Sequence, residues 1–517
     1  MAEVVKNNIP DIPAQKFNFA ATNGLLHDQK FDTKPVGYLR DAFRRFCKNK
    51  ASVVAAIIIL ILLVFSILAP MLSSYTVQFR DIYMTRKLPK AKGLEWLGWD
   101  GCQKATVGAS DYWQYLAITE ECGQEVVKTT YRRFEVETQM GTLTLTDTYY
   151  DIYVDTYARD GMIFLILTTQ EYADLQQYQD ENNVQIIYPA IPEQTGLNRN
   201  NANLWYETTS SGVRKGLPKG VNMETGEVTW KNNYVTYDAS DNYTSKMRLE
   251  GEDKPLYNYA ERKQGNTYKV RVHYLKYFEY LNGREPVFLF GTDQYGKDIF
   301  TRLAAGARFS LLFAVAISVI NLTIGAIYGA IEGYYGGKAD MIMERISDIL
   351  SGVPFMVVVT LFKLHVLEHV GAVVTLLFAF VTTGWIGMAG TVRMQFYRFK
   401  NHEYVLASRT LGANDWRVMW KHIFPNSLGT IVTSCVLVIP GVIFSESSLS
   451  YLGILNLESG NTTSVGTLMA NGQGELQNAP HIILFPALFI ALLMISFNLF
   501  GNGLRDAFNP SLRGSEG

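Results

Sequence analysis

Two stretches of the 517-residue chain resemble catalytic motifs, and neither carries the full set of residues that its chemistry needs. His402 and Glu403 begin an HExxH pattern, in which two histidines would bind zinc, but Leu406 stands where the second histidine belongs. Lys338 follows a glycine as in a phosphate-binding loop, yet Glu332 replaces the first glycine and an alanine follows the lysine. The sequence therefore predicts no catalytic residue, no metal site and no cofactor bound by this chain.

The four cysteines do not form a metal-binding cluster, because no CxxC or Cys/His grouping occurs. Cys102 and Cys122 both lie in the long polar middle of the chain. A disulfide between them would stabilise the fold by about 3 kcal/mol at best. Two separate thiols are the alternative, and the sequence leaves both interpretations open.

Apolar stretches dominate both sides of that polar middle. A helix of about 20 apolar residues is long enough to cross the hydrocarbon core of a membrane. The third stretch is the weakest, because Lys363 and His365 lie near its end. The six predicted spans are 51–72, 310–331, 349–367, 370–391, 428–449 and 481–502.

The positive charges of the short loops predict the orientation of these spans. Lysine and arginine gather before the first span, in the loop 392–427 and after the last span, whereas 451–480 has neither. Both termini and the loop 392–427 are therefore expected in the cytoplasm, and residues 73–309 and 451–480 outside. The net charge of −1 gives no general attraction to nucleic acid.

The middle segment, 73–287, is expected to form an extracytoplasmic α+β domain. Residues 133–147 alternate between apolar and polar side chains around Gly141, which predicts a hairpin. The other predicted elements are a buried strand at 161–168, a helix at 170–182, a strand at 184–188 and loops at 198–206 and 215–241.

The loop between the fourth and fifth spans reads NHEYVLASRTLGANDWRVMWKHIFPN over residues 401–426. A first helix is expected to break at Gly412, and Asn414 or Asp415 can cap a second helix that ends at Pro425. Exposed apolar side chains cost about 25 cal/mol per Å² of area in water. Two short helices that carry such side chains form a knob that needs a partner.

This loop resembles the EAA coupling motif of ABC-importer permeases, in which a glycine follows the E-A-A and an apolar residue and a proline close the motif. Leu406 occupies the place of the motif's glutamate. In such families the two helices dock in a cleft of the ATPase subunit. The ATPase-coupling residues that the resemblance implies are Glu403, Ala407, Ser408, Gly412, Ala413, Ile423 and Pro425.

Other segments resemble the oligopeptide, dipeptide and nickel permeases, in particular their second membrane subunit (oligopeptide permease C-like). GTDQYGKDIFTRL at 291–303 is similar to the signature before the second span, with Lys297 in place of the usual arginine. ESSLSYLGI at 446–454 and the ending at 497–513 are similar to further family segments. The resemblance covers residues 40–70 and 288–513.

The resemblance implies an all-α polytopic membrane protein with six transmembrane helices, like a type I ABC importer permease, and an inserted extracytoplasmic α+β domain. The expected parts are a cytoplasmic N-terminal tail at 1–50, the first transmembrane helix at 51–72, the inserted domain at 73–287, the permease core at 288–506 with its coupling loop 392–427, and a cytoplasmic C-terminal tail at 507–517.

The function that the resemblance implies is that of a non-catalytic permease subunit in the cell membrane, which forms half of a peptide translocation pathway. Expected partners are a second permease subunit, two ATP-binding subunits that carry ATP and Mg, an extracytoplasmic substrate-binding protein and membrane lipid. A dipeptide or nickel importer is the alternative, and no Met/His cluster favours nickel. A membrane receptor with an external sensing domain is the alternative of a different class.

Glu446 is the one acidic residue well inside the apolar part of the fifth span. Ionisable groups within a membrane are costly to bury and often functional. Glu446 is therefore a candidate for the substrate pathway, where it would contact the amino terminus of a peptide. The alternative is a residue near the helix end that hydrogen-bonds Ser447, Ser448 or a neighbouring backbone group.

Overall fold

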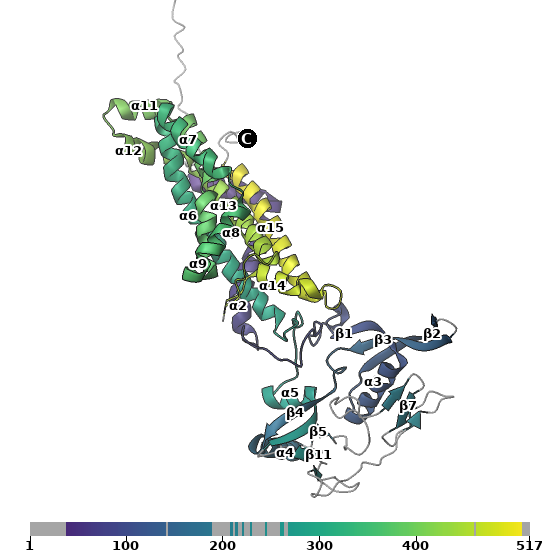
Figure 1. Cartoon of the computed structure of the whole chain (residues 1–517). Coiled ribbons are helices and arrows are strands. Elements are labelled where there is room, and N and C mark those ends of the chain that lie inside the picture. Colours follow the sequence, from purple (N-terminus) through teal and green to yellow (C-terminus); the bar gives the residue numbers. More distant parts are fainter. Residues whose placement is uncertain are drawn as a thin grey trace, which may run out of the picture.

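The computed structural model describes residues 38–140, 143–182, 184–188, 267–459 and 462–508, together with short strand segments between 207 and 262. A helical bundle carries a smaller part, built of strands and helices, at one of its ends (Figure 1). The chain leaves the bundle after helix α2 (Lys50–Leu72) and returns to it with α6 (Ile299–Tyr335). The smaller part is therefore an insertion between these two helices, and we call it the inserted part.

Five helices of the described chain are long and apolar enough to cross a membrane, or six if a bent pair counts as one span. The bent pair is α7 (Gly337–Ser351) with α8 (Phe355–His365). The five are α2, α6, the run Leu367–Phe399 that joins α9 (Leu367–Gly384) to α10 (Ile386–Phe399), the run Asp415–Tyr451 that includes α13 (Phe424–Tyr451), and α15 (His481–Phe508).

The third predicted span, 349–367, is wrong as a single straight helix. The structure bends the chain by 73° between α7 and α8. Pro354 precedes α8 there; proline has no backbone N–H and disfavours a helical conformation in the residue before it, so α7 stops at Ser351. The apolar composition of this stretch gave no sign of the bend.

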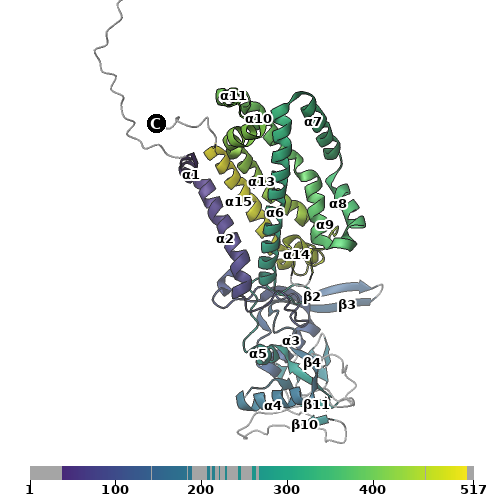
Figure 2. The same cartoon turned by 90° about the vertical axis from the view of Figure 1, so that its left-hand side faces the viewer.

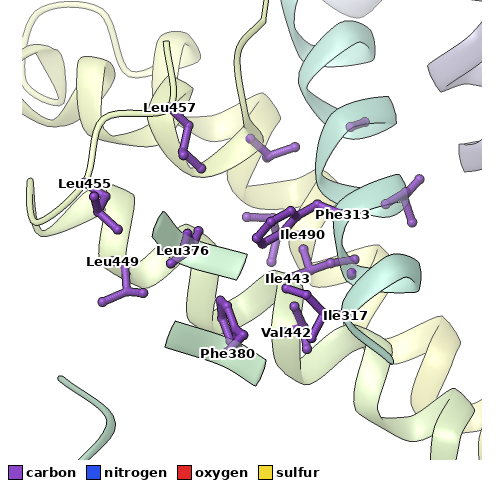
Figure 3. Packing of buried hydrophobic residues seen from close by; sticks show 14 of the residues in the cluster. Phe313, Ile317, Leu376, Phe380, Val442, Ile443, Leu449, Leu455, Leu457 and Ile490 are labelled. Atoms are coloured by element: carbon purple, nitrogen blue, oxygen red, sulfur yellow. The ribbon is translucent and has the colours of Figure 1, made fainter. Parts of the chain in front are cut away.

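The core of the bundle forms where α6, α9, α13 and α15 meet (Figure 3). Its side chains are almost all aliphatic or aromatic, so close packing contributes most of the contacts between the helices in this layer. The labelled members from these four helices are Phe313, Ile317, Leu376, Phe380, Val442, Ile443, Leu449 and Ile490.

Helix α6 approaches α10 closely along a stripe of glycines, Gly325, Gly329 and Gly333. A Cβ atom on Gly329 would lie 2.2 Å from the carbonyl oxygen of Ala389, which is closer than real contacts allow. The spacing of four residues puts all three glycines on one face of α6. These two helices therefore pack backbone against backbone, as small residues permit in membrane bundles.

The described residues of the inserted part form two larger antiparallel sheets and two two-stranded ones, β6 (Glu207–Thr209) with β7 (Gly212–Lys215) and β8 (Gly220–Val221) with β9 (Val228–Thr229) (Figures 1 and 2). The first has the order β1 (Cys102–Gly108), β3 (Leu143–Asp155), β2 (Val127–Met140), with α3 (Ala109–Cys122) packed against it. The second has the order β10 (Tyr243–Ser245), β11 (Tyr259–Arg262), β12 (Thr267–His273), β4 (Met162–Thr168), with β5 (Ile187–Tyr188) also paired to β12. The remaining elements are α4 (Thr169–Asn182) and α5 (Tyr274–Asn282).

Most local predictions for the inserted part are confirmed. The hairpin at 133–147 is the β2–β3 pair, the strand at 161–168 is β4 and the helix at 170–182 is α4. β4 is not a fully buried strand, because it ends the sheet order and Ile166 is 65% exposed. The predicted loop 198–206 lies outside the described residues, and the predicted loop 215–241 contains β8 and β9.

Cys102 and Cys122 are separate thiols in the structure rather than a disulfide. The thiol of Cys102 instead points to the carbonyl oxygen of Asp100, at 3.6 Å. Burial raises the pKa of the Cys102 thiol to about 12, so this thiol stays protonated at neutral pH.

The two chain segments that join the inserted part to the bundle lie side by side. The backbone N–H of Lys90 donates to the carbonyl oxygen of Phe288 at 2.9 Å. The ring of Phe288 stacks on Tyr75 with centroids 4.6 Å apart. An insertion whose ends meet in this way leaves the bundle connection intact.

We expect Gly329→Leu to destabilise the bundle by at least about 2 kcal/mol, because the new side chain would overlap the backbone of α10. The measurement is the midpoint of thermal unfolding of the purified chain in detergent. Gly387→Ala is the matched control, since nothing lies within 4 Å of a Cβ atom there. Equal midpoints for Gly329→Leu and the unaltered chain would contradict the close approach.

Candidate functional site

The predicted coupling loop forms a knob at the end of the bundle opposite the inserted part (Figures 1 and 2). The knob consists of α11 (Glu403–Thr410), α12 (Asp415–Arg417) and the turn between them. Helix α1 (Tyr38–Lys48) and the C-terminal end of α15 lie at the same end of the bundle (Figure 2). The knob and the inserted part are thus separated by the full length of the spans.

The turn of the knob follows from a glycine and a capping residue. Gly412 has a φ of +82°, which only glycine adopts without cost, and the N–H of Ala413 donates to the carbonyl oxygen of Ser408 at 3.1 Å. The side chain of Asn414 then accepts a hydrogen bond from the N–H of Arg417 at 2.9 Å. The predicted break at Gly412 and the predicted cap at Asn414 are both confirmed.

The prediction that the second helix ends at Pro425 is wrong. The chain stays helical from Asp415 to Tyr451, and a π-helical turn, η5 (Val418–Ile423), joins α12 to α13. In this turn the N–H of Phe424 donates to the carbonyl oxygen of Met419. We attribute the continuity to this wider turn, which accommodates a proline ring that would otherwise clash with the preceding turn. The knob is therefore built onto the end of α13.

The predicted coupling residues divide into a surface group and an anchor. Glu403, Ala407, Gly412 and Pro425 are exposed, and Ser408 and Ala413 are half-buried. Ile423 is fully buried in a cluster with side chains of α6, α10 and α11. A partner can reach the surface group directly, whereas Ile423 holds the knob against the bundle.

Leu411 and Trp416 are the apolar side chains that the knob exposes most, with 88% and 60% of their surface accessible. Sequence reasoning placed Trp416 on the second helix but included neither residue in the candidate site. The sequence does contain a signal for these exposed residues, since both are apolar and flank the glycine turn of a charged loop. Their exposure gives the knob an apolar tip.

Arg393 on α10 is a second feature that sequence reasoning missed. Its guanidinium donates to both carboxylate oxygens of Asp340, at 2.7 and 3.0 Å, and to both of Glu344, at 2.8 and 3.0 Å. Bidentate pairs of this kind fix orientation as well as distance. The arginine therefore ties α10 to α7 beside the knob.

Two contacts join the knob itself to α6. The hydroxyl of Tyr334 donates to the carboxylate of Asp415 at 2.6 Å. The guanidinium of Arg409 lies over the ring of the same tyrosine, 4.7 Å from its centroid. Both helices of the knob thus contact one residue of α6.

A buried ion cluster lies at the other end of the bundle, in the segment 291–303. Arg302 donates to Asp293 at 2.6 Å and to Glu458 at 2.7 Å, and Lys297 donates to the same oxygen of Glu458 at 2.7 Å. Burial would raise the pKa of Glu458, but Arg302, Lys297 and the amide of Asn471 together lower it. This cluster fastens the chain after α13 to the start of α6.

Glu446 is fully buried inside the bundle. The hydroxyls of Ser310, Ser450 and Ser447 donate to its carboxylate at 3.0, 3.1 and 3.4 Å. Ser310 belongs to α6, so the carboxylate joins α6 to α13. This geometry favours the packing interpretation of Glu446 over a residue that contacts substrate.

Two family descriptions match the chain. Residues 321–514 match "Binding-protein-dependent transport system inner membrane component", and residues 37–89 match "N-terminal TM domain of oligopeptide transport permease C".

Several curated relatives are similar over the bundle. The oligopeptide transport system permease protein OppC of Bacillus subtilis (strain 168) is 46% identical over 224 residues, 43% of this chain and 72% of that protein. The dipeptide transport system permease protein DppC of the same organism is 43% identical over 225 residues, 43% of this chain and 69% of that protein. DppC of Lactococcus lactis subsp. cremoris (strain MG1363) is 36% identical over 280 residues, 54% of this chain and 79% of that protein. The chain therefore belongs to the oligopeptide and dipeptide permease family, the multi-pass membrane components of binding-protein-dependent transport systems.

Proposed function

We propose that this chain is the permease subunit of an ATP-driven importer of peptides and forms one half of its translocation pathway. The similar relatives are oligopeptide and dipeptide permease proteins, which supports a peptide substrate. The observation that carries the proposal is the knob, an apolar-tipped pair of helices fused to a long membrane helix.

Separate ATPase chains bind the knob in this proposal, and they hold the ATP and Mg. Leu411 and Trp416 supply the buried centre of the contact, and Glu403, Ala407 and Gly412 surround it. The excess of lysine and arginine at this end of the bundle supports a cytoplasmic location for the knob and both termini. A second permease subunit completes the pathway.

The continuous helix from Asp415 to Tyr451 explains how an ATPase would move the bundle. A helix transmits displacement along its axis, because each turn is held by hydrogen bonds to the next. Closure of the ATPases around ATP would displace the knob and with it α13. The Arg393 pairs and the contacts of Tyr334 would pass the same displacement to α7, α10 and α6.

The inserted part lies at the opposite end, where an extracytoplasmic substrate-binding protein would deliver the peptide. Its position there supports a role in docking that protein, and the alternative is a packing role alone. Figure 2 shows the inserted part beyond the ends of the spans, with the β2–β3 hairpin projecting sideways close to the bundle.

We expect Leu411→Asp to weaken binding of the ATPase chains at least about tenfold, because a carboxylate would replace an apolar anchor at the centre of the contact. The measurement is the amount of ATPase that copurifies with the full-length permease. Ile166→Asp, at an exposed apolar site on β4, is the control and should leave copurification unchanged. Full copurification of ATPase with Leu411→Asp would contradict the assignment of the knob.

We expect Gly412→Val to reduce peptide uptake at least about tenfold while ATP hydrolysis continues, because valine is strained at a φ of +82° and the angle between the knob helices would change. Gly412→Asn should keep most of the coupling, since asparagine tolerates this conformation. Uptake of a labelled oligopeptide and ATP hydrolysis are measured on the same reconstituted complex. Normal uptake by Gly412→Val would show that the angle between the knob helices does not control coupling.

Excision of residues 92–286 tests the docking role of the inserted part. A short glycine–serine linker can join the ends, because Lys90 and Phe288 are hydrogen-bonded. We expect the shortened permease to copurify with the ATPases and to bind the substrate-binding protein at least about tenfold more weakly. Unchanged affinity for that protein would leave the inserted part with a packing role only.

A further inference from the structure

A cavity of about 500 Å³ lies where α2 ends, α6 begins and the inserted part joins the bundle. This volume is within the range of small-molecule binding sites, about 300–1,000 Å³. The lining combines an apolar wall with two cationic side chains. The wall includes Leu72, Val287, Leu289 and Phe300, and the cations are Lys92 and Arg284.

Arg284 is held in place but not neutralised. Its Nη2 donates to the carbonyl oxygen of Ser74 at 2.6 Å, and its guanidinium lies 4.8 Å from the ring centroid of Tyr75. Its Nε is buried and has no hydrogen-bond partner. No carboxylate of the described residues pairs with it. Arg284 therefore brings to the cavity lining a positive charge that no carboxylate of the described residues balances.

The lining also contains two carboxylates, those of Asp298 and Glu285, and neither pairs with Arg284. Asp298 caps α6 by accepting the N–H of Thr301 at 2.9 Å. Glu285 pairs with Lys92 at 3.1 Å, and both side chains are largely exposed. Exposed ion pairs contribute little, about 0–1 kcal/mol, so Lys92 can turn toward a ligand at small cost.

The cavity borders an exposed apolar surface of α2. Only 17% of the most apolar 18-residue stretch of α2 is buried within the chain. The last of the exposed apolar side chains of α2, Leu72, belongs to the cavity wall. The exposed set is Val54, Ile57, Leu60, Ile61, Leu63, Val64, Ile67, Leu68, Met71 and Leu72.

A short loop beside Lys92 carries exposed apolar and aromatic side chains. It exposes Leu94, Trp96 and Leu97, with 37%, 78% and 48% of their surface accessible. Tryptophan is enriched where a membrane meets water, because its ring is amphipathic. A tryptophan-bearing loop on one side of the cavity and the exposed apolar face of α2 on the other are what a site at the level of lipid headgroups would have.

We propose that this cavity binds the phosphate-bearing headgroup of a membrane phospholipid. Arg284 and Lys92 bind the phosphate, and the acyl chains lie along the exposed side of α2. Free inorganic phosphate shares the anionic chemistry but lacks the apolar part that the wall and α2 would contact.

The test is a binding titration of purified full-length chain in detergent with dioctanoyl phosphatidylglycerol, followed by native mass spectrometry. We expect Lys92→Gln and Arg284→Gln each to weaken binding about tenfold, the loss of one charged hydrogen bond. Lys104→Gln and Arg133→Gln remove exposed cations of the first sheet and should bind like the unaltered chain. Inorganic phosphate lacks the acyl chains, and dioctanoylglycerol lacks the phosphate. Each should bind at least about tenfold more weakly than the phospholipid.

Three results would overturn the proposal. Unchanged binding by Lys92→Gln would remove the cation from the site, and this variant is informative because Lys92 is 75% exposed and its loss does not threaten folding. Binding of dioctanoylglycerol as tight as that of the phospholipid would show that the phosphate is not recognised. Equal affinity for inorganic phosphate would identify a site for free anions. None of these measurements depends on transport activity.

Discussion

The structure depends on one unbroken helix that runs from Asp415 at the knob to Tyr451 near the opposite end of the bundle. Pro425 would normally end or kink such a helix. The π turn just before it absorbs the extra bulk, so the buried Met419 and Ile423 stay anchored in the bundle while Trp416 projects from it. A surface knob and a deep membrane helix are thereby one mechanical element.

The contacts around this helix determine what moves with it. The glycine stripe of α6 holds α10 at backbone distance, and Arg393 holds α10 to α7 through charged pairs. Both contacts depend strongly on geometry, because a glycine contact tolerates no added atom and a bidentate pair tolerates little rotation. A displacement of the knob would therefore shift these helices together instead of dissipating in flexible side chains.

The sequence predicted the spans, the knob turn and the hairpin because each rests on a local signal, such as the apolar run of α2, Gly412 with Asn414, or the alternation around Gly141. It did not predict the bend before Pro354 or the continuity through Pro425. Pro354 follows the end of one helix, whereas a π turn accommodates Pro425 within the other, and the sequence shows no difference between the two prolines. The Arg393 pairs join residues far apart in the sequence, so no spacing rule reveals them. The burial of Glu446 among serines of two helices escaped prediction for the same reason.

Ion clusters close both ends of the bundle, and an apolar core lies between them. Arg302 and Glu458 fasten one end and Arg393 and Asp340 the other, while the layer in Figure 3 is mostly apolar. Charged pairs with a fixed direction resist relative rotation at the ends, whereas apolar surfaces can slide with little change in contact area. A bundle with this distribution changes shape most easily by a shift in its middle layer. A displacement of the knob would reach that layer through α13, after the cluster around Ile423 that anchors the knob.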